Sequence, residues 1–192
     1  MKFVQEHTSQ TLEVKQSKFI AHLIPYELFT QTLKHLQQEH PKARHFVVAW
    51  RYMNAFDQVV EHCSDDGEPK GTSGKPTLAV LSGNDLINTA VIIVRYFGGT
   101  KLGTGGLVRA YSDACNLVIK NSETVDYVKL NRYNFHVVYT DLSLIEYRLD
   151  ELGISIDAKE FDEDGVMLKV STEESVWHTF CAQNGRIINM KH

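Results

Sequence analysis

The chain has 192 residues, of which 43% are hydrophobic, and its formal net charge at pH 7 is −4. This composition predicts a globular protein with an apolar core, and no apolar run approaches the ~20 residues that a membrane-spanning helix needs. The first 125 residues carry a net charge of +1 and the rest carry −5, which excludes a protein that coats nucleic acid with its whole surface. Any nucleic-acid contact is expected to be a local patch on the first half.

The N-terminal segment and the cysteines favour a reducing cytoplasm. The first residues, MKFVQEHTSQTLEV, contain no signal-peptide hydrophobic region. Cys63, Cys115 and Cys181 are isolated, without a C-x-x-C pair, so neither a disulfide framework nor a zinc ribbon is indicated. We expect no metal, no cofactor and no membrane partner.

The chain begins with a predicted hairpin, a helix and a strong strand. Short β-type runs at Thr11–Val14 and Phe19–Leu23 flank four polar residues, which is typical of a hairpin or a bent strand. A helix is expected to begin at Pro25 and to end before Pro41. The run Arg44–Tyr52 then predicts a strand.

A long polar segment, Met53–Lys75, follows this strand and is predicted to be a loop. Structureless loops of this length in a compact domain are usually functional or disordered. Pro76 is expected to lie at the first position of the next helix, where its missing N–H costs nothing.

The most informative stretch is a predicted strand, glycine loop and helix. Val91–Val94 is a short β-branched run typical of a buried strand, and apolar residues at helical spacing begin at Leu107. Between them, Gly98–Gly106 contains five glycines. A helix N-terminus behind such a loop points backbone N–H groups and the positive end of the helix dipole outward. Lys101 and Arg109 add two cations, so the sequence predicts an anion-facing surface.

The second half has its own pattern, and we place the domains at residues 1–125 and 130–192. Its expected strands are, in order, Tyr133–Tyr139, Ile154–Phe161, Val166–Val170 and Arg186–Met190. Asp141 is expected to cap a helix after the first strand, and Ser171 or Thr172 a helix after the third. The order βαββαβ is that of a ferredoxin-like domain.

Neither of two common nucleotide-binding fingerprints fits the glycine-rich segments. A Walker A loop requires Ser or Thr after Gly-Lys, whereas Gly74-Lys75 is followed by Pro76. The pattern G-x-G-x-x-G nearly fits from Gly103, but Val108 stands where the third glycine belongs. The glycines could also serve only the tight packing of a strand against a helix.

The acidic residues Asp65, Asp66 and Glu68 favour a structural role over a metal site. Carboxylates suit Mg²⁺, but these lack EF-hand spacing and lie in a Gly/Pro turn, where Asp favours local backbone hydrogen bonds. They could also pair with Arg95 or Lys101 and hold the long loop against the glycine loop.

No candidate catalytic group is persuasive. His62 and Cys63 are adjacent, and neighbouring residues on a strand point to opposite faces, so they are not expected to form a nucleophile–base pair. Ser73 lacks the G-x-S-x-G context of a nucleophile elbow. Tyr96 or Phe97 could stack on a base, although such residues are more often part of a core.

Two long blocks, Ser64–Leu81 and Val94–Tyr111, resemble the signature motifs of the IMPACT/YigZ family. Ser17–Ala21 and Ala43–His45 resemble its lesser motifs. The resemblance covers the whole first half, and the second half is similar to the small C-terminal domain of bacterial members. Two ungapped motifs in the same order make this resemblance specific.

The resemblance implies an α+β fold. The first domain would be like domain 2 of ribosomal protein S5 and the second would be ferredoxin-like, together similar to domains IV and V of elongation factor G. Eukaryotic relatives regulate translation through a protein partner of a kinase that phosphorylates an initiation factor. They use an additional N-terminal domain for this role, so the kinase-related role is not expected to carry over.

The leading hypothesis is a non-enzymatic protein that binds RNA or the ribosome through its first domain, without a DNA-specific signal. The predicted anion contacts are Arg95, Gly98, Gly99, Lys101, Gly103, Gly105, Gly106 and Arg109. The predicted supporting residues are Arg44, Asp65, Asp66 and Glu68. Two alternatives stay open: an enzyme that binds a small phosphorylated ligand or nucleotide at the same loop, with acidic residues on Mg²⁺, and a protein–protein adaptor.

Overall fold

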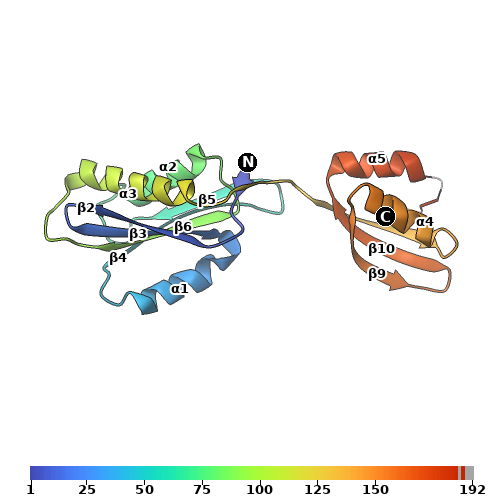
Figure 1. Ribbon diagram of the computed structural model, residues 1–192, viewed down its shortest axis with the longest axis horizontal. Helices are drawn as coiled ribbons and strands as arrows, with labels where there is room; N and C mark the ends of the chain where they lie inside the picture. The colour runs from blue at the N-terminus through green and yellow to red at the C-terminus, as the bar shows by residue number, and fades with distance from the viewer. Residues whose placement is uncertain (186, 189–192) are drawn as a thin grey trace. The chain divides into compact units, whose positions relative to one another are not determined.

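The computed structural model describes residues 1–185 and 187–188, and the chain separates into two compact units. The first unit is Met1–Tyr127 and the second begins at Val128 (Figure 1). Both combine helices with a sheet, so the predicted α+β, two-part fold is confirmed at this level. Among the described residues, no helix combines the length and apolar character that crossing a membrane requires.

The first unit is built on a five-stranded antiparallel sheet with the order β2-β3-β6-β4-β5. Its strands are β2 (Thr8–Val14), β3 (Ser17–Pro25), β4 (His45–Met53), β5 (Val59–Ser64) and β6 (Thr89–Tyr96). The predicted buried run Val91–Val94 lies in β6, the central strand, which is apolar on both faces because helices cover both faces.

Helices cover the two faces of this sheet in separate layers (Figure 1). On one face lie α2 (Gly74–Gly83) and α3 (Gly103–Lys120), and on the other lies α1 (Phe29–Glu39), which follows the short 3-10 helix η1 (Tyr26–Leu28). Alternation along β6 sends Val91 and Ile93 into the α2–α3 core and Ile92 and Val94 into the α1 core.

The predicted hairpin is confirmed, and the loop predicted after β4 is partly wrong. Lys15 and Gln16 both have positive φ, as a two-residue hairpin turn between β2 and β3 requires. Within Met53–Lys75, the residues Val59–Ser64 form β5, which pairs with β4. β5 is a short edge strand, and the polar residues that flank Val59 and Val60 conceal its strand character.

A two-residue strand pair closes the first unit at one end. In it, β1 (Lys2–Phe3) pairs antiparallel with β7 (Val125–Asp126). The segment that follows α3 is therefore fastened beside the N-terminal strand. The last turn of α3 lies at this end, and its first turn lies at the opposite end with the glycine loop.

The second unit is a three-stranded antiparallel sheet, ordered β8-β10-β9, with two helices. Its elements are β8 (Asn131–Val138), α4 (Leu142–Glu151), β9 (Ser155–Phe161), β10 (Gly165–Thr172) and α5 (Glu174–Asn184). Phe135, Trp177 and Phe180 form its aromatic core. The described elements follow the predicted order βαββα.

Two details of the second unit differ from the sequence prediction or lie beyond the described residues. Ser171 and Thr172 do not cap α5, because both still pair with β8 as part of β10, and the helix begins after Glu173. The predicted strand Arg186–Met190 falls largely on residues outside the described ranges, and Ile187 and Ile188 do not form a strand.

His22, on the α1 face of β3, predicts a pH-dependent stability. Its side chain is 7% exposed, its Nδ1 lies 3.0 Å from His7 Nε2, and its Nε2 has no hydrogen-bond partner in the described part of the chain. Burial, with smaller effects from His7 and His40, lowers the pKa of His22 from 6.5 to about 4. The unfolded state therefore binds this proton more tightly than the folded state. We expect the free energy of unfolding to fall by about 3 kcal/mol as the pH drops from 6.5 towards 4.

Urea unfolding of the protein and of His22→Leu across this pH range tests the prediction. The difference between the two profiles isolates His22 from the carboxylates that titrate in the same range. The variant should lose much of the acid sensitivity, and parallel profiles would contradict a neutral, buried imidazole.

Candidate functional site

The glycine loop is shorter than its sequence suggests. It connects the end of β6 at Tyr96 to α3, and the helix already begins at Gly103. Gly105 and Gly106, which the sequence analysis placed in the loop, belong to the first turn of α3. The chain enters the helix through Gly103, whose φ of +72° favours glycine.

The N-terminus of α3 is open to an anion. Leu102 occupies the N-cap position, and among the described residues no side chain caps this end, nor does the first turn contain an acidic residue. The first backbone N–H groups of a helix have no partner within the helix, so here they are available to an external acceptor. A Cβ added at Gly105 would meet nothing described within 4 Å, so a ligand can approach this backbone closely.

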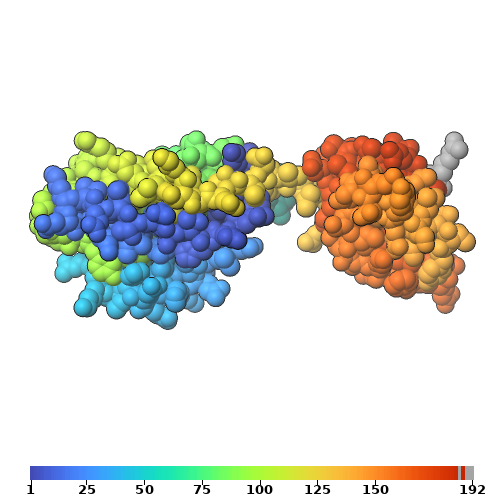
Figure 2. Space-filling model, viewed as in Figure 1, coloured from blue at the N-terminus to red at the C-terminus, as the bar shows by residue number. Residues whose placement is uncertain are grey.

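Gly98 fixes the glycine loop against the β2–β3 turn. Its N–H donates a hydrogen bond of 3.1 Å to Ser17 Oγ. A Cβ at this position would lie 2.0 Å from the backbone carbon of Gln16, so only glycine fits. Figure 2 shows the two segments, blue and yellow-green, side by side at one end of the unit. Gly98 therefore has a structural role, whereas Gly99 is exposed.

Asp65 organises the loop between β5 and α2. Its carboxylate accepts hydrogen bonds from Gly71 N–H (2.7 Å), Gly74 N–H (2.8 Å) and both the N–H (3.2 Å) and the hydroxyl (2.7 Å) of Ser73. Burial acts to raise the pKa of Asp65, but these hydrogen bonds outweigh it and hold the pKa below its ordinary value. The side chain is thus committed to folding the loop.

Asp66 ties the same loop to β4. Its Oδ2 accepts the N–H of Phe46 at 2.6 Å, and its backbone carbonyl accepts a hydrogen bond of 2.8 Å from His45 Nδ1. The structural interpretation of Asp65 and Asp66 therefore fits the geometry. Among the described residues, no group of three His, Cys, Asp or Glu side chains is arranged to hold a metal ion.

Glu68 forms a buried cluster with Arg95 and Tyr111. Arg95 Nη1 pairs with Glu68 Oε1, and the side chains are 7% and 3% exposed. Tyr111, on α3, donates a hydrogen bond of 2.8 Å to the same oxygen. Burial first, and then the Glu68 charge, raise the pKa of Tyr111, so its hydroxyl stays protonated. Arg95 also lies over the Phe19 ring, 5.4 Å from its centre.

This cluster borders a cavity of about 360 Å³ beside the first turn of α3. It is lined by Glu68, Arg95, Phe97 and Lys101 among others, and α3 contributes Gly103, Thr104 and Leu107. Arg95 Nε is buried and has no hydrogen-bond partner among the residues that the structure describes. Arg95, which was predicted as an anion contact, is buried and lines this cavity.

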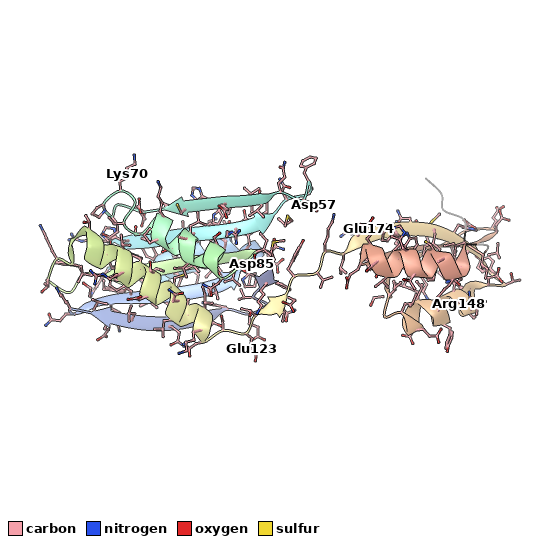
Figure 3. The ribbon with its side chains drawn as sticks, turned by 90° about the horizontal axis from the view of Figure 1, so that it is seen from above. Asp57, Lys70, Asp85, Glu123, Arg148 and Glu174 are labelled. Atoms are coloured by element: carbon pink, nitrogen blue, oxygen red, sulfur yellow. The ribbon has the colours of Figure 1, made fainter. Side chains whose placement is uncertain are left out.

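Exposed cations from several segments gather at this end of the first unit. They are Lys15, Lys18, Lys42, Arg44, Lys70, Lys75, Lys101 and Arg109. The β2–β3 turn, the start of β4, the end of β5 and the start of both α2 and α3 bring them together. In Figure 3, Lys70 lies at this end, whereas Asp57, Asp85 and Glu123 lie towards the other end of the unit. We call the cation-rich end, defined by these eight residues, the basic end.

Of the predicted site residues, Lys101, Arg109 and Arg44 all lie exposed at the basic end. Of the two predicted pairings of an acidic residue, with Arg95 or with Lys101, the structure contains the pair of Glu68 with Arg95. Tyr111 was not among the predicted residues. A tyrosine on the apolar side of a helix was the available signal, because a buried hydroxyl needs a partner.

The groups dismissed as catalysts also have structural partners. On β5, His62 stacks on Trp50 with ring centres 5.2 Å apart, whereas Cys63 packs against the core on the other face of the sheet. They do not form a pair, as predicted. Burial raises the pKa of Cys63, which disfavours a thiolate. Ser73 is buried and bonded to Asp65.

Comparison with known proteins agrees with the sequence motifs. The model of the Impact N-terminal domain matches residues 15–119. A relative from Escherichia coli (strain K12), the IMPACT family member YigZ, is 39% identical over 83% of this chain and 79% of its own length. The crystal structure of a protein described as hypothetical is 32% identical, covers 96% of this chain and 91% of its own, and has a TM-score of 0.72. The structure of the two-domain translational regulator Yih1 is 20% identical over 62% of this chain and 48% of its own, with a TM-score of 0.39.

Proposed function

Because the chain belongs to the IMPACT family, whose signature blocks build the basic end, we propose that this end is the working surface of the protein and that it binds RNA through its phosphates. The observation that carries the proposal is the meeting of exposed cations with the uncapped start of α3. Lys101 and Arg109 neutralise phosphates. The backbone N–H groups of Gly103 and Gly105 donate hydrogen bonds to a phosphate oxygen, which can approach closely because glycine has no side chain.

The acidic residues of the β5–α2 loop are held by partners within the protein. Glu68 is neutralised by Arg95, Asp65 accepts hydrogen bonds within the loop, and Asp66 accepts one from Phe46 on β4. The cations around them are exposed and come from segments far apart in sequence. An extended polyanion therefore fits this surface better than a single small anion, because it can meet several cations at once.

We place this binding in translation, on the ribosome or on a structured RNA, as the family resemblance implies. The same resemblance implies that the first unit is like domain 2 of ribosomal protein S5, and the order βαββα supports a ferredoxin-like second unit. The second unit carries the excess of negative charge, so its proposed role is contact with protein and not with RNA.

The double variant Lys101→Ala/Arg109→Ala tests the proposal. Two fewer phosphate contacts should reduce the slope of log affinity against log salt by about 1.5, because each contact contributes about 0.7 to 0.9. Fluorescence anisotropy of a labelled stem-loop RNA at several salt concentrations measures this slope for the protein and the variant.

The matched control is Lys2→Ala/Lys120→Ala, which removes two exposed charges from the other end of the unit. It should leave the slope nearly unchanged. Equal losses in both double variants would show a nonspecific charge effect. A protein that binds no RNA even at low salt would refute the proposal and favour a small ligand or a protein partner.

A further inference from the structure

We propose that the cavity beside Arg95 holds one unpaired nucleobase of the bound RNA, while a phosphate of that nucleotide lies at the start of α3. This inference rests on the proposed function and makes it selective for RNA with unpaired bases. The cavity and the open helix end are adjacent, since Gly103, Thr104 and Leu107 of α3 line the cavity. A nucleotide has a planar, largely apolar base, which would enter the cavity, and an anionic phosphate, which would bind at the helix end.

The walls of the cavity suit a planar, largely apolar group. Phe97, Leu102 and Leu107 line it, and its volume of about 360 Å³ lies within the range of small-molecule pockets. The Phe97 side chain is 56% exposed although it sits next to the buried end of β6. A base that stacks on this ring would cover apolar surface, and aromatic stacking tolerates any of the four bases.

Arg95 lines the cavity and brings a hydrogen-bond donor group to its wall. The guanidinium is well held, because Glu68 pairs with its Nη1 and the rings of Phe19 and Phe97 flank it. Nucleobases carry carbonyl oxygens and ring nitrogens along their edges, which are acceptors for such a group.

The charges around the cavity favour an anionic ligand over a cation. Glu68 is the acidic residue among those that line it, and Arg95 neutralises this carboxylate. Lys101 and the positive end of the α3 dipole then give the opening a net positive character. A nucleotide of a nucleic acid meets this condition, whereas an amine or a bare cation does not.

Phe97→Ala tests the inference with three labelled RNAs. They are a stem-loop, the same stem-loop with abasic loop positions, and a fully paired duplex of equal length. The variant should bind the stem-loop about five- to a hundred-fold more weakly, which is the range for losing one base–aromatic stack. Its binding to the abasic stem-loop and to the duplex should stay the same, as should the salt slope, because no charge is removed.

Two further variants make the test specific. Phe97→Trp keeps a stacking surface and should retain stem-loop binding. Phe56→Ala removes a side chain that is 82% exposed in the β4–β5 turn, far along the strands from the cavity, and should have no effect.

The outcomes separate this inference from the proposed function. Equal binding of the stem-loop and the duplex, unchanged in Phe97→Ala, would overturn the nucleobase site and leave phosphate binding in place. An equal loss for all three RNAs would show that Phe97 only supports the glycine loop, which also overturns it. If none of the RNAs binds, both the function and the nucleobase site fail.

Discussion

Glu68→Ala should lower the free energy of unfolding of the first unit by about 3–5 kcal/mol, the usual cost of removing one partner of a buried ion pair. The substitution leaves the Arg95 guanidinium buried at 7% exposure without its counter-charge, and it removes the acceptor of the Tyr111 hydroxyl. The effect is therefore much larger than the loss of one hydrogen bond. We expect the cation-rich loops to loosen as well, since Glu68 joins the β5–α2 loop to β6.

Urea unfolding followed by Trp50 fluorescence in a Trp177→Phe background measures this effect. The chain has two tryptophans, one in each unit, so Trp50 alone reports on the first unit. Glu39→Ala is the control, because it breaks an exposed pair with His35 on α1 and should cost less than about 1 kcal/mol. A similarly small loss for Glu68→Ala would mean that the buried pair does not hold the loop.

Gly98→Ala should destabilise the first unit by at least about 3 kcal/mol, because the new Cβ would overlap the backbone of the β2–β3 turn. The nearest atoms, 2.0 to 2.2 Å away, all belong to the main chain of Gln16 and Ser17. No side-chain rotation can relieve this overlap, so the glycine loop or the hairpin must move. The same urea titration measures the loss.

Gly105→Ala is the matched control, since it adds the same methyl group seven residues later along the chain. Gly105 lies in α3, is not among the glycines with positive φ, and has nothing described within 4 Å of the added Cβ. Alanine is the better helix former, so this variant should be more stable by about 0.5 kcal/mol. Equal effects of the two substitutions would contradict the tight contact of Gly98 with the turn.

The sequence predicted those parts of the fold whose signals are local. The apolar run Val91–Val94 identified the central strand, because a strand buried on both faces must be apolar throughout. Lys15 and Gln16 lie between two alternating runs, and the hairpin formed there. The helix after the glycines was also expected, although five glycines concealed where it begins.

The parts that sequence reasoning missed depend on partners distant in the chain. Strand β5 is a short edge strand with exposed Glu61 and His62, and it forms by pairing with β4. The sequence left open whether an acidic residue would pair with Arg95 or Lys101, because that choice is made by the packing of the β5–α2 loop. Tyr111 enters the cluster from α3, 43 residues after Glu68, and no local pattern records that contact.

The gathering of eight exposed cations at the basic end of the first unit has a kinetic consequence. A protein with an excess of positive charge at one end is oriented by the electric field of a polyanion before the two molecules touch. Productive collisions are then more frequent than they would be with random orientations. Encounter with RNA would then be fast and would slow sharply as salt is added, whereas the lifetime of the formed complex would depend on the close contacts at α3. The opposite end of the unit, where Asp57, Asp85 and Glu123 lie, would be repelled by the RNA and would therefore point away from it during the encounter (Figure 3).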